Sequence, residues 1–111
     1  MKIVRNRLLP IGRRYSAINL FGILFVKPGV RLSDQLLRHE TIHTRQMREL
    51  LYLPFYLMYV AEWLWHLVRL RGDAYRAYLA ISFEREAYLN QNDTAYLASR
   101  RRFAPLRRNA D

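Results

Sequence analysis

Residues 50–68 form an apolar run that any fold of this chain must either bury or place against a membrane. The run reads LLYLPFYLMYVAEWLWHLV. At 19 residues it approaches the ~20 that a membrane-spanning helix needs. It contains Pro54, Glu62 and His66, and a charge at mid-bilayer costs roughly 2.5–3.5 kcal/mol. We therefore expect a core or interfacial helix, and contact with a membrane is the alternative.

The composition indicates one packed domain. A chain of 111 residues can build a modest core but not two domains. Hydrophobic residues make up 51% of the sequence and aromatic residues 14%, which argues against disorder. We expect a single domain over residues 1–111, with a basic, flexible tail from about residue 103.

The formal net charge of +10 suggests an anionic partner, either a nucleic acid or a membrane surface. Much of the basic charge lies at the two ends of the chain, and no helix-turn-helix, RRM or KH signature is present, so we expect no nucleic-acid partner. The sequence has no cysteine, which excludes disulfides and thiolate metal sites. Cysteine-free composition fits a reducing cytosol, so we expect a cytoplasmic protein, with association with a membrane as the alternative.

The N-terminal third predicts strands. Residues 18–26, INLFGILFV, are short, apolar and rich in branched and aromatic side chains, and Pro28 and Gly29 close them. Residues 2–9 predict a second strand that pairs with the first. We expect these two strands to form a short β-hairpin.

The rest of the chain predicts helices. Ser33 is a candidate N-cap for a helix over residues 34–52, which Pro54 should kink or end near Leu53. Further helices are expected over residues 55–69, 74–81 with Asp73 as cap, 83–91 with Ser82 as cap, and 95–102. The predicted fold class is α+β and mostly α, with the hairpin packed on a bundle of three to four helices.

The sequence HETIH, residues 39–43, lies inside the first predicted helix. Residues i and i+4 share one face of a helix, so His39 and His43 can direct their imidazoles at a single ion, with Zn–N distances of roughly 2.0–2.1 Å. Glu40 is rotated by about 100° and can reach a water on that ion. This is the geometry of the H-E-x-x-H metallohydrolases. The alternative is a pair of half-exposed histidines with an incidental glutamate.

A catalytic zinc site needs a third protein ligand. The best candidate stretch is SFEREAY, residues 82–88, in which Glu84 and Glu86 lie about 200° apart on a helix, so at most one faces the metal. Weaker rivals are Asp73, Asp93, Glu62 and His66. A straight helix would place Glu84 opposite about residue 60. The zinc hypothesis therefore requires helix 55–69 to lie at a sharp angle to helix 34–52.

HETIH followed by EREAY resembles the gluzincin-type zinc metallopeptidases, most of all their HtpX-like and CAAX-prenyl-protease-like group, in which H-E-x-x-H is joined by E-x-x-A-D. The resemblance implies a small bacterial member with Zn²⁺ as cofactor and a peptide or protein as substrate. It implies His39, His43 and Glu84 as metal ligands and Glu40 as the general base. Tyr88 stands where that group has aspartate, and Arg45 stands where an apolar residue is usual.

The surroundings of the metal are less constrained by the sequence. A ligating imidazole usually donates its other N–H to a carboxylate or carbonyl, and the candidate carboxylates are Asp34, Glu49, Glu86 and Asp93. Arg85 or a tyrosine can stabilise an oxyanion. Tyr88 is expected either near the metal or in the core. The strand at 18–26 is either an edge strand that holds substrate or a plain core strand.

The sequence thus predicts a zinc-dependent metallohydrolase, most specifically a small metallopeptidase in which Glu40 activates zinc-bound water. Two alternatives stay open. One is a non-enzymatic, basic, membrane-associated protein in which HETIH is incidental. The other is a zinc-binding protein without peptidase activity.

Overall fold

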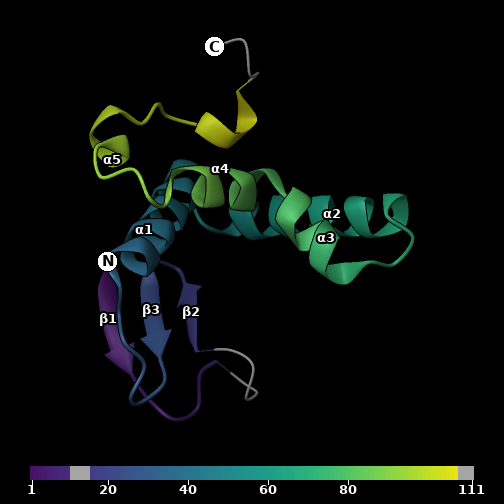
Figure 1. Ribbon diagram of the computed structural model, residues 1–111. Helices are drawn as coiled ribbons and strands as arrows, with labels where there is room; N and C mark the ends of the chain where they lie inside the picture. Colours follow the sequence, from purple (N-terminus) through teal and green to yellow (C-terminus); the bar gives the residue numbers. More distant parts are fainter. Residues whose placement is uncertain (11–15, 108–111) are drawn as a thin grey trace.

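The computed structural model describes residues 1–10 and 16–107, and it has the α+β, mostly helical fold that the sequence predicts (Figure 1). A three-stranded sheet packs at one end of a group of helices. The strands are β1 (Lys2–Arg5), β2 (Ala17–Leu20) and β3 (Ile23–Val26). The helices are α1 (Asp34–Glu49), α2 (Leu53–Arg69), α3 (Ala74–Ala80), α4 (Ser82–Asn90) and α5 (Tyr96–Ser99), followed by the 3₁₀ helix η1 (Ala104–Leu106).

The sheet confirms that residues 2–5 pair with part of the 18–26 segment and that the fold has a short N-terminal hairpin, and it corrects which strands form that hairpin. The expected single strand over residues 18–26 is itself a hairpin of β2 and β3, because Phe21 and Gly22 take positive φ angles of 54° and 85° and turn the chain. The first strand, β1, pairs with β3 in parallel and is therefore not part of the hairpin. The strand order is β1-β3-β2, so β2 lies at an edge of the sheet.

The helix that carries HETIH begins at Asp34 as the sequence predicts, and it ends at Glu49, earlier than the predicted end at residue 52. The Ser33 hydroxyl accepts a hydrogen bond from the Leu36 N–H at 3.1 Å, so Ser33 is the N-cap. After α1, Leu51 and Tyr52 take positive φ angles, and Pro54 lies in the first turn of α2, where its missing N–H leaves no bond unmade. The break near Pro54 is therefore confirmed, although Pro54 begins α2. In Figure 1, α2 lies at a sharp angle to α1, as the zinc hypothesis required.

The two short helices α3 and α4 are joined by the buried Ile81 alone. Asp73 caps α3 by accepting from the Arg76 N–H at 3.1 Å, as predicted. Ser82 is not the cap of α4. It is the first helical residue, and its N–H and hydroxyl both donate to the carboxylate of Glu62 on α2. This carboxylate fixes the start of α4 against α2.

A small core joins the helices. Met47 of α1, Phe55 of α2, and Ile81 and Phe83 near the start of α4 pack together, each at most 2% exposed. The inner side of α2 is covered by this core, whereas its outer side is not. Within the described residues, none of the helices combines the length and apolar character needed to cross a membrane.

Candidate metal centre

Helices α1 and α4 bring close together three side-chain atoms that could bind one metal ion. The Nε2 atoms of His39 and His43 on α1 are 3.1 Å apart. The Oε1 atom of Glu84 on α4 lies 3.0 Å from the His43 Nε2 atom and 3.3 Å from the His39 Nε2 atom. The side chains are buried, with 8%, 6% and 5% of His39, His43 and Glu84 exposed. The structure therefore brings together the three residues that the sequence analysis named as ligands.

These separations fit a metal ion. Three atoms that each lie about 2.0–2.1 Å from one tetrahedral ion are roughly 3.3–3.4 Å apart from one another. The observed 3.0–3.3 Å is slightly tighter, and a small outward shift of the side chains would meet that spacing. Two imidazoles and one carboxylate also form a donor set found at catalytic zinc sites.

Gln46 fixes the tautomer of His43. The Gln46 Nε2 group donates to the Phe83 carbonyl at 2.9 Å and to Glu86 Oε1 at 2.8 Å, so its Oε1 atom must be the end that faces His43. His43 Nδ1 lies 2.8 Å from that oxygen and is therefore the protonated nitrogen. The lone pair of a neutral His43 is then on Nε2, directed at Glu84 and His39.

Gln91 plays the same part for His39. Its Oε1 atom lies 2.8 Å from His39 Nδ1, which places the His39 proton on that side as well. The expectation that a carboxylate would receive these protons, from Asp34, Glu49, Glu86 or Asp93, is therefore wrong, because both acceptors are glutamine amides. The spacing of Gln46, three residues after His43 on the same helical face, carried a usable signal. The sequence held no such signal for Gln91, because Gln91 lies beyond the last residue of α4.

The converging lone pairs need a positive charge among them, either a proton or a metal ion. Burial by itself would lower the pKa of His43, but the hydrogen bond and negative charge of Glu84, helped by Glu40, raise it to about 9. Burial would likewise raise the pKa of Glu84, but the hydrogen bonds to His39 and His43 outweigh burial and hold that pKa well below its usual range. Glu84 is therefore ionised and suited to bind a cation.

Glu40 lies beside the three ligands on the wall of a cleft of about 950 Å³. Burial raises the pKa of its carboxyl above the usual value, although the nearby imidazoles of His43 and His39 oppose the shift. The Glu40 carbonyl accepts a hydrogen bond from Asn19 Nδ2 on β2 at 3.0 Å. The same amide donates to the Thr44 hydroxyl, so β2 is fastened to the turn of α1 that carries the motif.

Tyrosines surround the site. Tyr59 of α2 donates its hydroxyl to the second carboxylate oxygen of Glu84 at 2.6 Å. The Tyr88 ring stands edge-on to His39, with ring centroids 4.6 Å apart, and its hydroxyl bonds to that of Tyr78 at 2.9 Å. Burial, and the nearby charge of Glu84, raise the pKa of Tyr59 and Tyr78, so both hydroxyls stay protonated and can donate.

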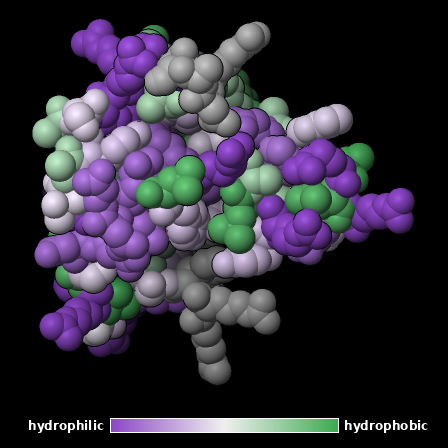
Figure 2. Space-filling model, turned by 45° about the horizontal axis from the view of Figure 1, so that its top comes forward, coloured by the Kyte–Doolittle hydropathy of each residue, from purple (hydrophilic) through white to green (hydrophobic). Residues whose placement is uncertain are grey.

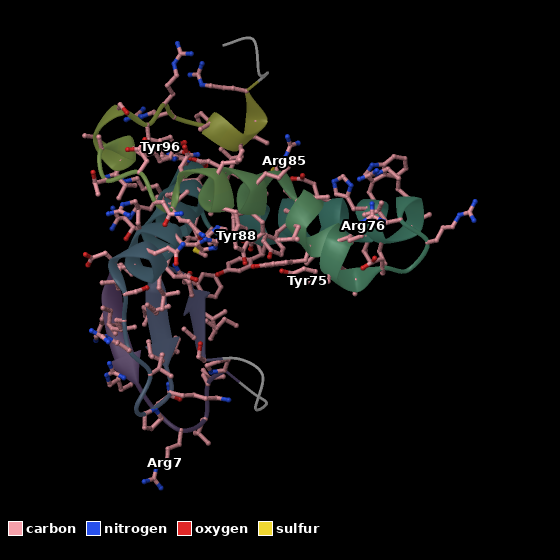
Figure 3. All side chains as sticks on the ribbon, viewed as in Figure 1. Arg7, Tyr75, Arg76, Arg85, Tyr88 and Tyr96 are labelled. Atoms are coloured by element: carbon pink, nitrogen blue, oxygen red, sulfur yellow. The ribbon has the colours of Figure 1, made fainter. Side chains whose placement is uncertain are left out.

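Arg85 is not part of this site. Figure 3 shows Tyr75 and Tyr88 on the side of the helices that faces the sheet, while Arg85 points to the opposite side. Of the two predicted candidates for stabilising an oxyanion, Arg85 therefore lies away from the site, and a tyrosine stays a prediction. Arg45, which replaces a usual apolar residue, is exposed and donates to the Leu97 carbonyl at 2.9 Å.

The rival third ligands are occupied elsewhere. Glu86 pairs with Arg100 and accepts from Gln46, while Glu62 holds the start of α4. His66 accepts from the Arg69 side chain. Asp73 and Asp93 are exposed, and they accept from the backbone N–H groups of Arg76 in α3 and of Ala95. Glu84 alone of these candidates reaches His39 and His43.

In comparisons with known proteins, no family model, curated protein or solved structure gives a significant match to the chain.

Proposed function

We propose that this protein is a zinc-dependent hydrolase that acts on peptides. The observation that carries the proposal is the buried convergence of His39 Nε2, His43 Nε2 and Glu84 Oε1 beside the carboxylate of Glu40. The resemblance of HETIH and EREAY to gluzincin-type metallopeptidases supports the same reading from the sequence.

In this proposal, three residues hold the metal ion and a fourth transfers protons. His39, His43 and Glu84 would hold the ion, with both imidazoles oriented by glutamine amides and Glu84 by Tyr59. A bound Zn²⁺ would polarise a substrate carbonyl and make water nucleophilic at neutral pH. Glu40 accepts the proton of the attacking water and returns it to the leaving amine.

The raised pKa of Glu40 suits this role. A general base works best when its pKa approaches the working pH, and burial moves the Glu40 carboxyl in that direction. The pKa of Glu84 shifts in the opposite direction, because the hydrogen bonds to His39 and His43 lower it. The two carboxylates are thereby separated into a proton acceptor and a cation ligand.

The cleft favours an extended peptide as substrate. Its wall includes all four residues of β2, and β2 is an edge strand beside Glu40. An edge strand offers backbone groups that pair with an extended chain. The cleft is also lined by the aromatic residues Phe55, Tyr56, Tyr59 and Trp63 of α2, which suit apolar or aromatic substrate side chains.

Metal content tests the proposal first. We expect one zinc per chain in untagged protein, lost or much weakened in His43→Ala and Glu84→Gln. His66→Ala is the matched control, since His66 lies outside the site, and it should retain zinc. Absence of zinc from the parent even after reconstitution would refute the metallohydrolase.

Hydrolysis is the second measurement. Glu40→Gln should keep its zinc and lose at least ~10²-fold in the rate of cleavage of a peptide library. Zinc without any cleavage in the parent would leave a zinc-binding protein and remove the catalytic part of the proposal.

A further inference from the structure

The outward side of α2 is an exposed apolar surface, which we call the α2 outer face. Its members are all at least 50% exposed, and they are Leu53, Leu57, Val60, Leu64, Trp65 and Val68. At 100° per residue they cover an arc of about 140° along the whole helix. Residues Phe55, Tyr59 and Trp63 on the other side already pack against the core or the cleft. The α2 outer face therefore contributes nothing to the core of this chain.

The α2 outer face also lacks charge along its length. Glu62 is the one charged side chain between Leu53 and Val68, and it turns inward to bind Ser82. By contrast, the face seen in Figure 2 is mainly hydrophilic, with separate hydrophobic groups. A long uncharged apolar stripe on one helix is a binding surface more often than a chance exposure.

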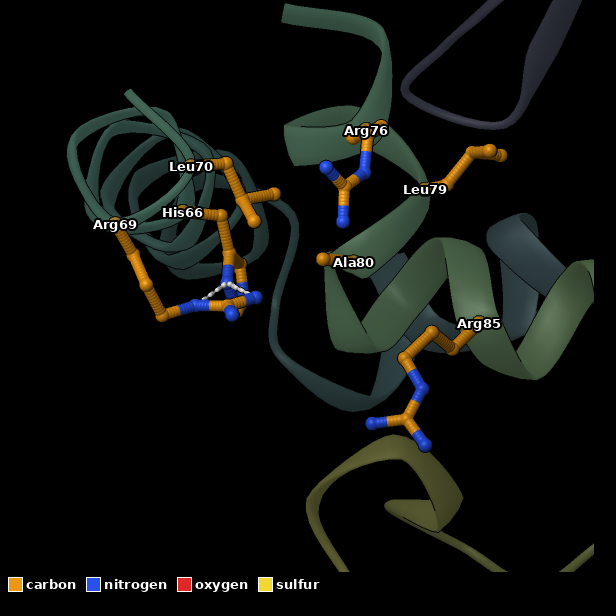
Figure 4. Close-up of a pocket in the computed structure, with 7 residues that line it drawn as sticks. All are labelled: His66, Arg69, Leu70, Arg76, Leu79, Ala80 and Arg85. Carbon is orange, nitrogen blue, oxygen red and sulfur yellow. Dashed lines mark hydrogen bonds between the residues drawn. The ribbon is translucent and has the colours of Figure 1, made fainter. Parts of the chain in front are cut away.

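A basic pocket lies near the C-terminal end of α2, on the side of the helix that faces α3 and α4, with Arg69 the pocket residue nearest the α2 outer face. Three helices contribute to this pocket of about 420 Å³, in which Arg69 and His66 come from α2, Arg76 from α3 and Arg85 from α4 (Figure 4). The three arginines are exposed. Arg69 donates to His66 Nδ1, which holds its guanidinium over the pocket. Guanidinium groups in this arrangement suit phosphate or carboxylate headgroups.

Few carboxylates of the described chain are exposed, so few of them would repel an anionic partner. Asp34, Asp73 and Asp93 are the exposed ones within residues 1–10 and 16–107. The others, Glu40, Glu49, Glu62, Glu84 and Glu86, are buried or half-buried; Glu49 and Glu86 pair with Arg100, and Glu62 binds Ser82. The exposed charge of the described surface is therefore mostly basic.

We propose that the α2 outer face docks onto the surface of an anionic lipid bilayer, which the mostly basic exposed charge of the described surface, including Arg69 near the edge of the face, would attract. Amphipathic helices lie in the interface when an apolar side is accompanied by basic residues, and Trp65 suits the headgroup boundary. A second copy of the chain is the weaker occupant, because two molecules that each carry a net charge of +10 repel one another.

Vesicle co-sedimentation tests this proposal with the full chain. We expect binding to phosphatidylcholine vesicles that contain phosphatidylserine, weaker binding to phosphatidylcholine alone, and loss of the difference at high salt. Tryptophan emission should shift to shorter wavelength on binding. The double variant Leu57→Glu/Leu64→Glu should bind at least about tenfold more weakly, because it places charges on the face. Arg69→Glu/Arg76→Glu should lose the preference for phosphatidylserine.

Matched controls use residues of similar exposure elsewhere. Leu89 on α4 is 77% exposed, and Leu89→Glu should bind vesicles like the parent. Arg7 lies in the loop after β1, far from α2 in Figure 3, and Arg7→Glu should also leave binding nearly unchanged. Failure of the parent to bind phosphatidylserine vesicles would overturn the proposal, as would equal binding by Leu57→Glu/Leu64→Glu. A dimer in sedimentation equilibrium that this double variant dissociates would assign the face to a second copy instead.

The zinc measurements and the vesicle measurements are independent. Leu57 and Leu64 do not line the cleft, so Leu57→Glu/Leu64→Glu should retain the parent's zinc content whichever way binding to vesicles turns out.

Discussion

Two buried glutamates on α4 lie two residues apart and have opposite surroundings. Glu86 meets a cation that the chain supplies, since Arg100 donates from Nη2 to Glu86 Oε1 at 3.1 Å and reaches Glu49 at 2.8 Å through Nη1. Glu84 meets two imidazoles and a tyrosine hydroxyl. The Glu86 cluster contains its own cation, whereas the Glu84 cluster could hold a metal ion supplied from outside the chain.

The difference follows from the cost of burying charge. A buried carboxylate is stable only when it is paired and hydrogen-bonded. Arginine is always protonated, so the Glu86 cluster keeps its cation at any ordinary pH. Imidazoles can lose their proton and offer lone pairs to a metal. We infer that the Glu86 cluster stabilises the fold, while the Glu84 cluster is built for binding.

The largest expected effect comes from removing the chain's own cation. Arg100→Met leaves Glu86 and Glu49 without their cationic partner, and the Arg100 side chain is only 2% exposed, so the free energy of unfolding should fall by roughly 3–5 kcal/mol. Urea denaturation measures this loss. Arg101→Met, an exposed neighbour, should change stability by about 0.5 kcal/mol at most. A loss below about 1 kcal/mol for Arg100→Met would show that the pair is no stronger than a surface pair.

Supplying the missing cation should stabilise the other cluster. On the proposed function, free zinc at a hundred times its Kd raises the free energy of unfolding by about 2.7 kcal/mol through binding to the folded state. Denaturation of chelator-treated protein, with and without zinc, gives this difference. Glu84→Gln should show almost none of it, while Arg101→Met should show all of it. Equal stabilisation of parent and Glu84→Gln would place the metal elsewhere.

Gln46 connects the two clusters, so its replacement should disturb both. Gln46→Leu removes the acceptor for His43 Nδ1 and a donor to Glu86, and zinc affinity should fall about 10–100-fold. Competition with a chromophoric chelator measures the affinity. Gln46→Glu keeps an acceptor for His43 but sets a second carboxylate against Glu86. It should therefore restore zinc affinity toward that of the parent while lowering stability. If Gln46→Leu binds zinc like the parent, the orientation of His43 does not depend on Gln46.

The smallest effect is expected at Tyr59. Tyr59→Phe removes one hydrogen bond to Glu84 Oε2 and keeps the ring that packs on Phe83 and Phe55. Zinc affinity should fall less than about tenfold, and stability by about 1 kcal/mol. Tyr78→Phe is the matched control, since its hydroxyl bonds to Tyr88 and not to a ligand. An effect of Tyr59→Phe as large as that of Gln46→Leu would make Tyr59 the main support of Glu84.

The shared face of His39 and His43 could be predicted because it rests on local helical geometry. The cap at Ser33 follows from the same kind of local signal. Each of these two features needs only a few neighbouring residues to be specified. The approach of Glu84 is not local, since it needs the break before Pro54 to let α4 return to α1, and the choice of Glu84 came from the resemblance to gluzincin-type metallopeptidases.

The features that the sequence did not predict depend on the packing of elements that are distant in the sequence. A continuous apolar run hid the turn at Phe21, and nothing in residues 2–5 marks a parallel partner for β3. Ser82 fits the pattern of a cap, but Glu62, twenty residues earlier, takes both of its donors. The glutamine partners of the histidines were missed because carboxylates were the expected acceptors.

The contact between His43 and Glu84 joins residues 41 apart in the sequence, and α2 and α3 lie entirely within that segment. An ion shared by both residues would act as a cross-link that closes this loop in any partly unfolded chain. Loop-closure entropy for that length is about 3 kcal/mol. The exposed helix α2, which owes little to the core on its outer side, would thus be held in place by metal bound to its neighbours.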